Sequence, residues 1–254
     1  MSFIINEKGF ANNPPKSSPS AYQKYVDVIA KLEKEFTAGI NFLDIGCGIG
    51  QAVARLSDTL NHGSQATGVD VSGYSIELAK QSGKGIFLQY GGSRLPFSDH
   101  HFDVVGSNNV LEHVNDPISF LSEANRVLKP NGYLIVACPN FLSISNGYHH
   151  HTKGIIQKIN NILMIINKTF SDGYDFKKMS AIKRERFQPD DDACNVTNPL
   201  DIVKWAKRHK LETLYWSSQL EYKQGIVNLI DRSYLRLFLG ACFFVFMKSN
   251  EKNP

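Results

Sequence analysis

One short stretch constrains the fold more than any other part of the chain. Residues 41–51 read Asn-Phe-Leu-Asp-Ile-Gly-Cys-Gly-Ile-Gly-Gln, an apolar run followed by three glycines at alternate positions. The apolar run is typical of a buried strand. The glycines allow a tight turn and the close approach of a ligand, which a Cβ would block, and a helix starting behind them offers free N–H groups to an anion. The stretch therefore predicts a strand–loop–helix unit with a ligand site at the loop.

From residue 41 to residue 140, short apolar runs alternate with amphipathic segments, a rhythm typical of βα units and a parallel sheet. Strands are predicted at Phe42–Ile45, Ala66–Asp70, Gly85–Gln89, Phe102–Ser107 and Gly132–Cys138, and helices over 49–61, 73–82 and 117–129. Helical spacing also runs from Tyr22 to Phe36, and a helix over 199–210 precedes strands at Leu211–Ser217 and Ala241–Lys248. The pattern predicts one α/β fold.

The rhythm breaks after Asn140, and residues 141–197 contain no clear strand. We interpret 1–40 as an N-terminal arm and helix, 41–140 as the ligand-binding core, 141–197 as an inserted, mostly helical cap for the substrate, and 198–254 as a helix and closing strands of the core. Residues 1–35 are expected to share in the cap. The basic amphipathic pattern over 153–170 leaves two interpretations open, peripheral contact with a membrane or closure of a hydrophobic pocket in the same protein.

Two carboxylates accompany the glycine loop. Asp44 precedes the first glycine. A carboxylate at this position would not help to bind a pyrophosphate, but it would suit a ligand with an amino group and a sulfonium. Asp70 ends the second strand, 20 residues beyond Gly50, where a carboxylate can accept both hydroxyls of a ribose. Its alternative role is to cap the helix that starts near Gly73. Together with the loop, the ribose role is favoured.

Residues 41–139 resemble the class I S-adenosylmethionine (SAM)-dependent methyltransferases, specifically the small-molecule group typified by ubiquinone and menaquinone biosynthesis enzymes. The resemblance rests on five ordered motifs: Leu-Asp-Ile-Gly-Cys-Gly-Ile-Gly (43–50), Gly-Val-Asp (68–70), Leu-Pro-Phe-Ser-Asp-His-His-Phe-Asp-Val-Val (95–105), Asn-Asn-Val-Leu-Glu-His-Val-Asn-Asp-Pro (108–117) and Arg-Val-Leu-Lys-Pro-Asn-Gly-Tyr-Leu (126–134). It implies a Rossmann-like, seven-stranded, mostly parallel sheet with helices on both faces and an antiparallel last strand. It also implies SAM as cofactor and S-adenosylhomocysteine as product.

The resemblance further implies which residues bind the cofactor: Asp44, Gly46, Cys47, Gly48, Gly50, Asp70, Val71, Gly92, Ser93, Asn108 and Asn109. The glycine loop and Asp44 would hold the methionine part, Asp70 the ribose, and Val71 the adenine. Asn108 and Asn109 would lie beside the methionine moiety and the transferred methyl. Family members often carry an acid before Leu-Pro-Phe that contacts the adenine amino group. Gly91 stands there in this chain, so adenine would rely on Ser93 or on backbone groups.

Methyl transfer to an oxygen needs a base, and histidine is the usual choice. His113 is the first candidate, because it follows the fourth strand; its alternative role is packing and hydrogen bonding at a helix start. His149, in the run 149–151 past the fifth strand, is the second candidate, and the run is otherwise a metal patch or a solvated loop. Some quinone O-methyltransferases bind a metal around the Glu-His pair, but Asn109 stands where an acid would be expected. We therefore predict no metal, and interpret Asp190–Asp192 as loop charge and helix capping rather than a cation site.

Composition narrows the class of protein further. With 28 basic and 24 acidic residues, the net charge of +4 is too small and scattered to predict nucleic-acid binding. The four cysteines show no C-x-x-C spacing, which indicates reduced thiols in a cytoplasmic protein. The N-terminus lacks the apolar region of a signal peptide, and the longest apolar stretch, Leu237–Met247, is too short to span a bilayer. No feature predicts an oligomeric state.

The sequence thus favours an enzyme that moves a methyl group from SAM to a small-molecule acceptor, an oxygen of a sugar, glycolipid precursor or aromatic metabolite. Transfer to nitrogen or carbon is the weaker variant. Two alternatives stay open: a SAM-binding partner or sensor without catalysis, suggested by the changed adenine stretch, and a nucleotide-dependent oxidoreductase on a related sheet.

Overall fold

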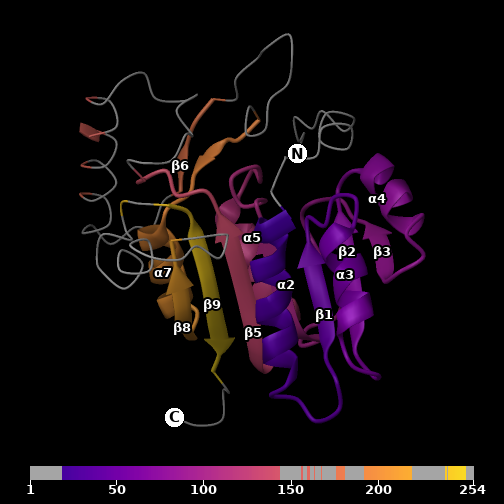
Figure 1. The fold of residues 1–254 in the computed structure, drawn as a ribbon. Coiled ribbons are helices and arrows are strands. Elements are labelled where there is room, and N and C mark those ends of the chain that lie inside the picture. Colours follow the sequence, from indigo (N-terminus) through magenta and orange to yellow (C-terminus); the bar gives the residue numbers. More distant parts are fainter. Residues whose placement is uncertain are drawn as a thin grey trace.

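The computed structural model describes residues 19–143, 156, 159–160, 163, 167, 176–180, 192–218, 238 and 240–249. Its helices are α2 (Pro19–Glu33), α3 (Gln51–Thr59), α4 (Gly73–Lys80), α5 (Pro117–Val127) and α7 (Pro199–Arg208). Its strands are β1 (Asn41–Ile45), β2 (Gln65–Asp70), β3 (Ile86–Gln89), β4 (Phe102–Asn108), β5 (Leu128–Cys138), β6 (Lys177–Lys178), β7 (Asn195–Val196), β8 (Leu211–Ser217) and β9 (Cys242–Lys248). Figure 1 shows their arrangement.

Seven strands form the main sheet, in the order β3-β2-β1-β4-β5-β9-β8. Every pair from β3 to β5 is parallel, and β9 runs antiparallel to both of its neighbours. The predicted Rossmann-like sheet with an antiparallel last strand is confirmed. Because β1 lies at the centre with β2 and β4 beside it, the ends of these three strands meet at one edge, which is where ligands bind in open α/β sheets.

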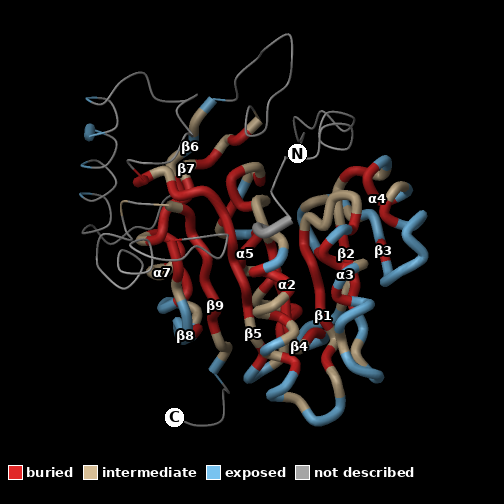
Figure 2. Tube along the Cα trace, in the orientation of Figure 1, coloured by how far each residue is buried: buried red, intermediate tan, exposed pale blue. Residues whose placement is uncertain are grey.

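Helices cover both faces of the sheet. One core cluster joins apolar residues of α2, α3 and α4 to one face, and another joins α5 and α7 to the opposite face. Figure 2 shows the buried strands between these layers. Phe42 and Leu43 are both fully buried although they point to opposite faces, as expected for a central parallel strand that is covered on both sides.

Two boundaries differ from the prediction for identifiable reasons. Helix α3 starts at Gln51 because Gly50 adopts φ 78°, which is left-handed and cannot continue a helix. Strand β5 starts at Leu128, which pairs with Phe102, and the expected stop at residues 129–132 is instead an irregularity within the strand. Asn131, with φ 62°, provides the bend there, since asparagine tolerates this conformation better than most residues.

The N-terminal helix belongs to the core. Tyr25, Val26 and Ile29 of α2 are at most 3% exposed and pack with Phe42 and Ile135 of the sheet. The expectation that residues 1–35 form part of a cap is therefore wrong for α2. The spacing of its apolar residues predicted the helix correctly, but it could not say which surface the helix covers.

A small second sheet also departs from the prediction of no strand within 141–197. Strands β6 and β7 pair antiparallel and lie beyond the carboxyl ends of the main strands (Figure 1). The backbone N–H groups of Cys194 and Asn195 donate to the carbonyl of Glu112 at 2.8 and 3.0 Å, and the hydroxyl of Thr197 donates to the carbonyl of Pro139 at 2.7 Å. These bonds join the insertion to the loops that follow β4 and β5.

Much of the insertion lies outside the described residues, including His149–His151, Lys183–Arg186, Asp190 and Asp191. Of the segment 153–170, five residues are described, and all are helical and exposed: Ile156, Ile159, Asn160, Leu163 and Asn167. In the described part of the chain, no helix combines the length and apolarity needed to cross a membrane.

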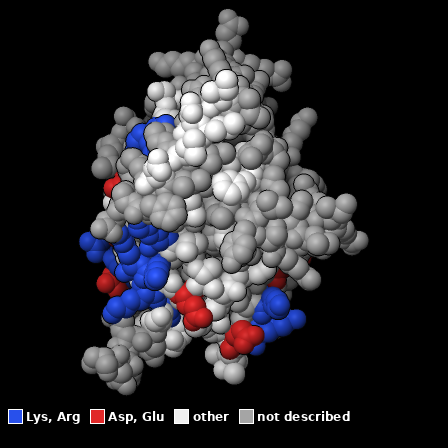
Figure 3. All heavy atoms as spheres, turned by 90° about the vertical axis from the view of Figure 1, so that its left-hand side faces the viewer, with Lys and Arg blue, Asp and Glu red and all other residues white. Residues whose placement is uncertain are grey.

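Basic side chains gather on the side of the molecule that carries α7 (Figure 3). Helix α7 ends in Lys207 and Arg208, and its N-cap residue Asn198 accepts a hydrogen bond from the backbone of Asp201. Cations at a helix C-terminus complement the macrodipole. The interaction with the helix macrodipole explains part of this basic surface, so that part need not indicate a binding site for another molecule.

Candidate functional site

The glycine loop between β1 and α3 is held against β2. The N–H groups of Gly46 and Cys47 both donate to the carbonyl of Val69, at 2.8 and 3.0 Å. A Cβ on Gly46 would lie 2.3 Å from Val110, and one on Gly50 would lie 2.5 Å from Phe87. These two glycines are therefore required by packing.

Gly48 differs from its two neighbours. It has φ 54°, and no atom of the described residues lies within 4 Å of the position that a Cβ would take. The backbone here borders open space rather than a packed core. A ligand can approach the peptide planes closely at this point.

Asp70, at the end of β2, reaches the loop. Its carboxylate accepts hydrogen bonds from the N–H of Gly48 at 2.9 Å and the N–H of Ser72 at 2.8 Å. Burial raises its pKa, although these hydrogen bonds act in the opposite direction. The side chain that caps α4 is Ser72, which accepts from the N–H of Ser75. The alternative role of Asp70 as the helix cap is therefore wrong.

Asp44 is a buried carboxylate near the end of β1, only 4% exposed. Its Oδ1 accepts a hydrogen bond of 2.8 Å from the hydroxyl of Tyr25 on α2. Burial raises the pKa of Asp44 to about 7; the bond from Tyr25 lowers it and the charge of Asp70 raises it. Tyr25 could not be predicted to lie here, because its spacing fits an ordinary core position of a helix.

The loop after β4 lies against the glycine loop through Val110. Asn108 ends the strand, and the N–H of Asn109 donates to the carbonyl of Ala137 at 2.8 Å. Asn109 has φ 57°. Within the described part of the chain, its buried Oδ1 and the buried hydroxyl of Ser107 make no hydrogen bond. Unpaired buried polar atoms are costly, so their presence at this edge favours a ligand there.

The remaining predicted residues lie around the ends of β2 and β3. Val71 is half-buried, and its carbonyl accepts a hydrogen bond from the side chain of Gln89. Gly92 has φ 79°, Ser93 is exposed, and among the described residues no atom lies within 4 Å of a Cβ placed on Gly91.

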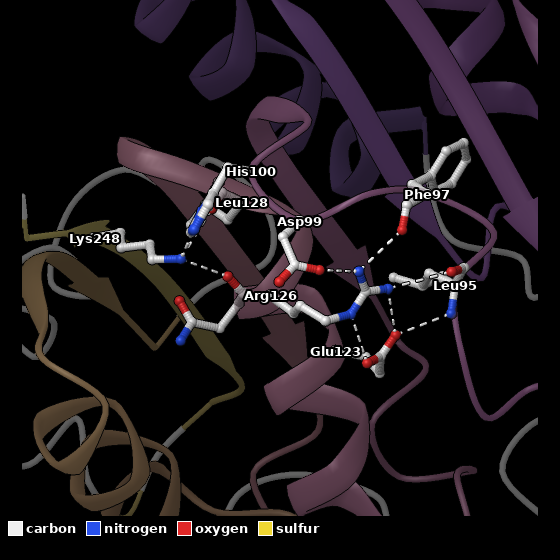
Figure 4. Close-up of polar contacts among 9 residues, drawn as sticks. Leu95, Phe97, Asp99, His100, Glu123, Arg126, Leu128 and Lys248 are labelled. Carbon is white, nitrogen blue, oxygen red and sulfur yellow. Dashed lines mark hydrogen bonds and ion pairs between the residues drawn. The ribbon is translucent and has the colours of Figure 1, made fainter.

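Arg126 of α5 fastens the segment that follows Ser93 (Figure 4). Its guanidinium donates to the carbonyls of Leu95 and Phe97 at 3.2 and 2.9 Å, and to both oxygens of Glu123 at 2.8 Å. It also pairs with Asp99 at 2.7 Å. Hydrogen bonding to Arg126 lowers the pKa of Glu123 and of Asp99.

His113 lies between two carboxylates. Its Nδ1 is 3.0 Å from Oδ1 of Asp192, at an angle that does not make a linear hydrogen bond, and its Nε2 is 3.6 Å from Oε1 of the fully buried Glu112. Asp192 was predicted to be a charged residue of a loop. In the structure it pairs with the candidate base His113, which lies 79 positions earlier in the sequence. His149 lies outside the described residues.

Metal binding finds no support in the part of the chain that is described. There, no group of three or more His, Cys, Asp or Glu side chains is placed to hold an ion. The absence of a metal stays a prediction.

The comparisons with known proteins agree with this geometry. The family described as "Methyltransferase domain" matches residues 43–136. A demethylmenaquinone methyltransferase of Staphylococcus epidermidis is 38% identical, over 45% of this chain and 47% of that protein. An O-methyltransferase of Aspergillus sclerotiorum is 34% identical, over 41% and 44%. An uncharacterized protein of Methanocaldococcus jannaschii is 30% identical, over 71% and 76%.

The chain spans between a third and a half of the length of the first curated relatives that it matches. Among solved structures, a chain of the Haloferax volcanii complex between the Trm112 methyltransferase activator and a methyltransferase has a TM-score of 0.62 at 17% identity, over 98% of this chain and 100% of that chain. A SAM-dependent methyltransferase of Methanosarcina mazei has a TM-score of 0.57 at 19% identity, over 87% and 98%. These two structures share the fold. Residues 43–136 belong to the methyltransferase-domain family, in a chain with the fold of SAM-dependent methyltransferases, and the cofactor of this family is SAM.

Proposed function

We propose that this chain binds SAM at the glycine loop and transfers its methyl group to an oxygen of a small molecule. In this proposal Asp70 accepts the ribose hydroxyls, and Asp44 faces the α-ammonium group. Adenine lies against Val71, Gly92 and Ser93. The remaining contacts to the methionine part come from the backbone of the loop (Gly46, Cys47, Gly48 and Gly50) and from Asn108 and Asn109.

The observation that carries the proposal is the open space at Gly48 between two largely buried carboxylates. The N–H of Gly48 is bonded to Asp70, and Asp44 is four residues away at the end of the same strand–loop unit. A ligand with an ammonium group at one end and a hydroxylated ribose at the other matches both acids. The unpaired Oδ1 of Asn109 offers a further acceptor.

The protein's contribution to the reaction is chiefly positioning. When bound, SAM would supply an electrophilic methyl group, and the residues of the site would hold this group in line with the acceptor oxygen. Alignment of the two reactants can lower the barrier by about 7–11 kcal/mol. The acceptor hydroxyl must also lose its proton, and we assign that proton to His113.

The surroundings of His113 suit this role. A carboxylate beside one ring nitrogen stabilises, through its charge, the imidazolium that forms when the other nitrogen takes a proton. Asp192 stands 3.0 Å from Nδ1. The separation of 3.6 Å between Nε2 and Glu112 is longer than a hydrogen bond. His113 and Asp192 then form the catalytic pair, with Asp192 as the positioning residue.

Two kinds of observation support the acceptor class. Two curated relatives, from Aspergillus sclerotiorum and Pyrenophora dematioidea, carry the name O-methyltransferase, but the matched region covers only 44% and 54% of them. The small sheet β6–β7 beyond the carboxyl edge borders the site and would contribute to the acceptor pocket. A sugar, a glycolipid precursor or an aromatic metabolite fits this proposal.

The test incubates the purified chain with SAM carrying an isotope-labelled methyl group and the small-molecule fraction of a cell extract. The expected result is a labelled small molecule whose methyl carbon has the chemical shift of an O-methyl group. His113→Gln should lower the rate by about 10²–10⁴-fold with SAM affinity unchanged, and Asp192→Asn should give a smaller loss. His62→Gln, at an exposed histidine, is the matched control and should keep the wild-type rate.

Other outcomes point elsewhere. SAM binding without any labelled product would favour the alternative of a non-catalytic SAM sensor or partner. A labelled N-methyl or C-methyl product, or a full rate in His113→Gln, would remove the oxygen acceptor or the base from the proposal. Binding of NAD but not SAM in calorimetry would overturn it entirely.

A further inference from the structure

We infer that Tyr25 of α2 is a positioning residue of the cofactor site: its hydroxyl holds one oxygen of Asp44 and leaves the other for a cationic group of the ligand. This inference rests on the proposed role of Asp44 toward SAM. It adds a residue from outside the glycine loop, contributed by the N-terminal helix.

The backbone shows how the two side chains come together. Asp44 lies in register with Gly68 on β2 and Gly106 on β4, so both neighbouring strands carry a glycine beside the carboxylate. A Cβ on Gly106 would lie 1.9 Å from the hydroxyl of Tyr25, and a Cβ on Gly68 would lie 2.8 Å from Sγ of Cys47. The missing side chains therefore make room for Tyr25 on one side of Asp44 and for Cys47 on the other.

Tyr25 has little freedom to move from this position. It is 1% exposed, and its ring packs edge-on against Phe42 with centroids 6.2 Å apart. Its hydroxyl donates to Oδ1 of Asp44 at 2.8 Å, while in the described part of the chain no donor reaches Oδ2. A carboxylate held at one oxygen has a fixed orientation, which is the preorganisation that a charged ligand group needs.

The bond also affects the charge of Asp44. The groups that face its carboxylate are Tyr25 from α2, Asp70 from the end of β2 and Cys47 from the loop. Of these, Tyr25 is the donor, and hydrogen bonding to the charged form favours that form. Removing the hydroxyl should therefore raise the pKa of Asp44 and reduce the ionised fraction that attracts the ammonium group.

The experiment measures SAM affinity by calorimetry from about pH 5.5 to 7.5, a range around the raised pKa of Asp44, in the full-length chain. Tyr25→Phe, which removes only the oxygen, should weaken SAM binding by about tenfold at neutral pH and move the acid limb of the affinity profile to higher pH. Tyr133→Phe is the matched control, because Tyr133 packs in the same core cluster against Phe36. It should leave both readouts unchanged.

A double-mutant cycle distinguishes the loss of the Tyr25–Asp44 hydrogen bond from a general loss of stability. In the Asp44→Asn background, Tyr25→Phe should cause little further loss of affinity, because the charged acceptor is already gone. An unchanged acid limb in Tyr25→Phe, or equal losses with and without Asp44, would overturn the inference while leaving SAM binding intact. Failure of the wild type to bind SAM would instead overturn the proposed function.

Discussion

At the scale of single residues, Gly48 and Gly50 show that two glycines of one loop can be needed for different reasons, one for ligand binding and one for packing. Both have positive φ, at 54° and 78°. A Cβ on Gly50 would collide with Phe87 and Ala79, whereas one on Gly48 would meet no atom of the described part of the chain. Gly50 is thus required by the fold, and Gly48 is required only if a ligand occupies the space beside it.

This difference gives a prediction that separates folding from binding. Gly48→Ala should fold with a loss of about 1–2 kcal/mol from its left-handed backbone, yet lose most SAM affinity because the new methyl group occupies ligand space. Gly50→Ala carries the same backbone penalty and a collision in the core, so its loss of stability should be larger. Urea denaturation and calorimetry with SAM measure the two effects. Normal SAM affinity in Gly48→Ala would show that the ligand lies elsewhere.

At the scale of elements, Arg126 connects α5 to the segment between β3 and β4. The side chain of Arg126 is 18% exposed, and its guanidinium contacts two backbone carbonyls and the carboxylate of Asp99 in that segment, and the carboxylate of Glu123 on its own helix. The segment carries Gly92 and Ser93 just before Leu95. Its conformation therefore depends on a side chain more than 30 residues away.

We expect Arg126→Met to destabilise the chain by about 1.5–3 kcal/mol, the usual range for hydrogen bonds to charged groups. It should also weaken SAM binding, because the adenine side of the site loses its support. Arg55→Met is the control: Arg55 is exposed and makes one long bond to Gln23, so its effect should stay within about 0.5 kcal/mol. Equal urea midpoints for the two variants would contradict the role of Arg126.

The elements also show how far sequence reasoning reaches. The five parallel strands could be predicted because each is a short apolar run between turn residues, and the glycine loop identified Asp44 and Asp70 because both are adjacent to it in sequence or strand order. Tyr25 and Asp192 could not be identified. Tyr25 joins the site through α2, and Asp192 approaches His113 from the insertion, so each depends on long-range packing. The two-residue strands β6 and β7 are too short to show a periodic pattern.

At the scale of the whole molecule, the role proposed for Asp44 comes at the expense of stability. The pKa of this carboxyl rises from its ordinary value of 3.8 to about 7 through burial. The folded state therefore binds the proton more tightly than the unfolded state. The resulting stabilisation is fully present below pH 3.8 and is lost as the pH rises through about 7.

Asp44→Asn should reveal this trade-off. The amide keeps the shape and an acceptor for Tyr25 but carries no charge, so at pH 8 the variant without ligand should be more stable than the wild type, by up to about 4 kcal/mol from the size of the pKa change. The difference should shrink toward pH 5, where the wild-type carboxyl is protonated; other titrating groups cancel between the two proteins. SAM should then narrow the difference: it stabilises the wild type by about 2.7 kcal/mol at a hundred times its Kd and the variant much less. Urea denaturation of both proteins at pH 5 and pH 8, with and without SAM, measures these differences in stability. If the variant without SAM is less stable than the wild type at pH 8, the buried charge of Asp44 does not destabilise the fold.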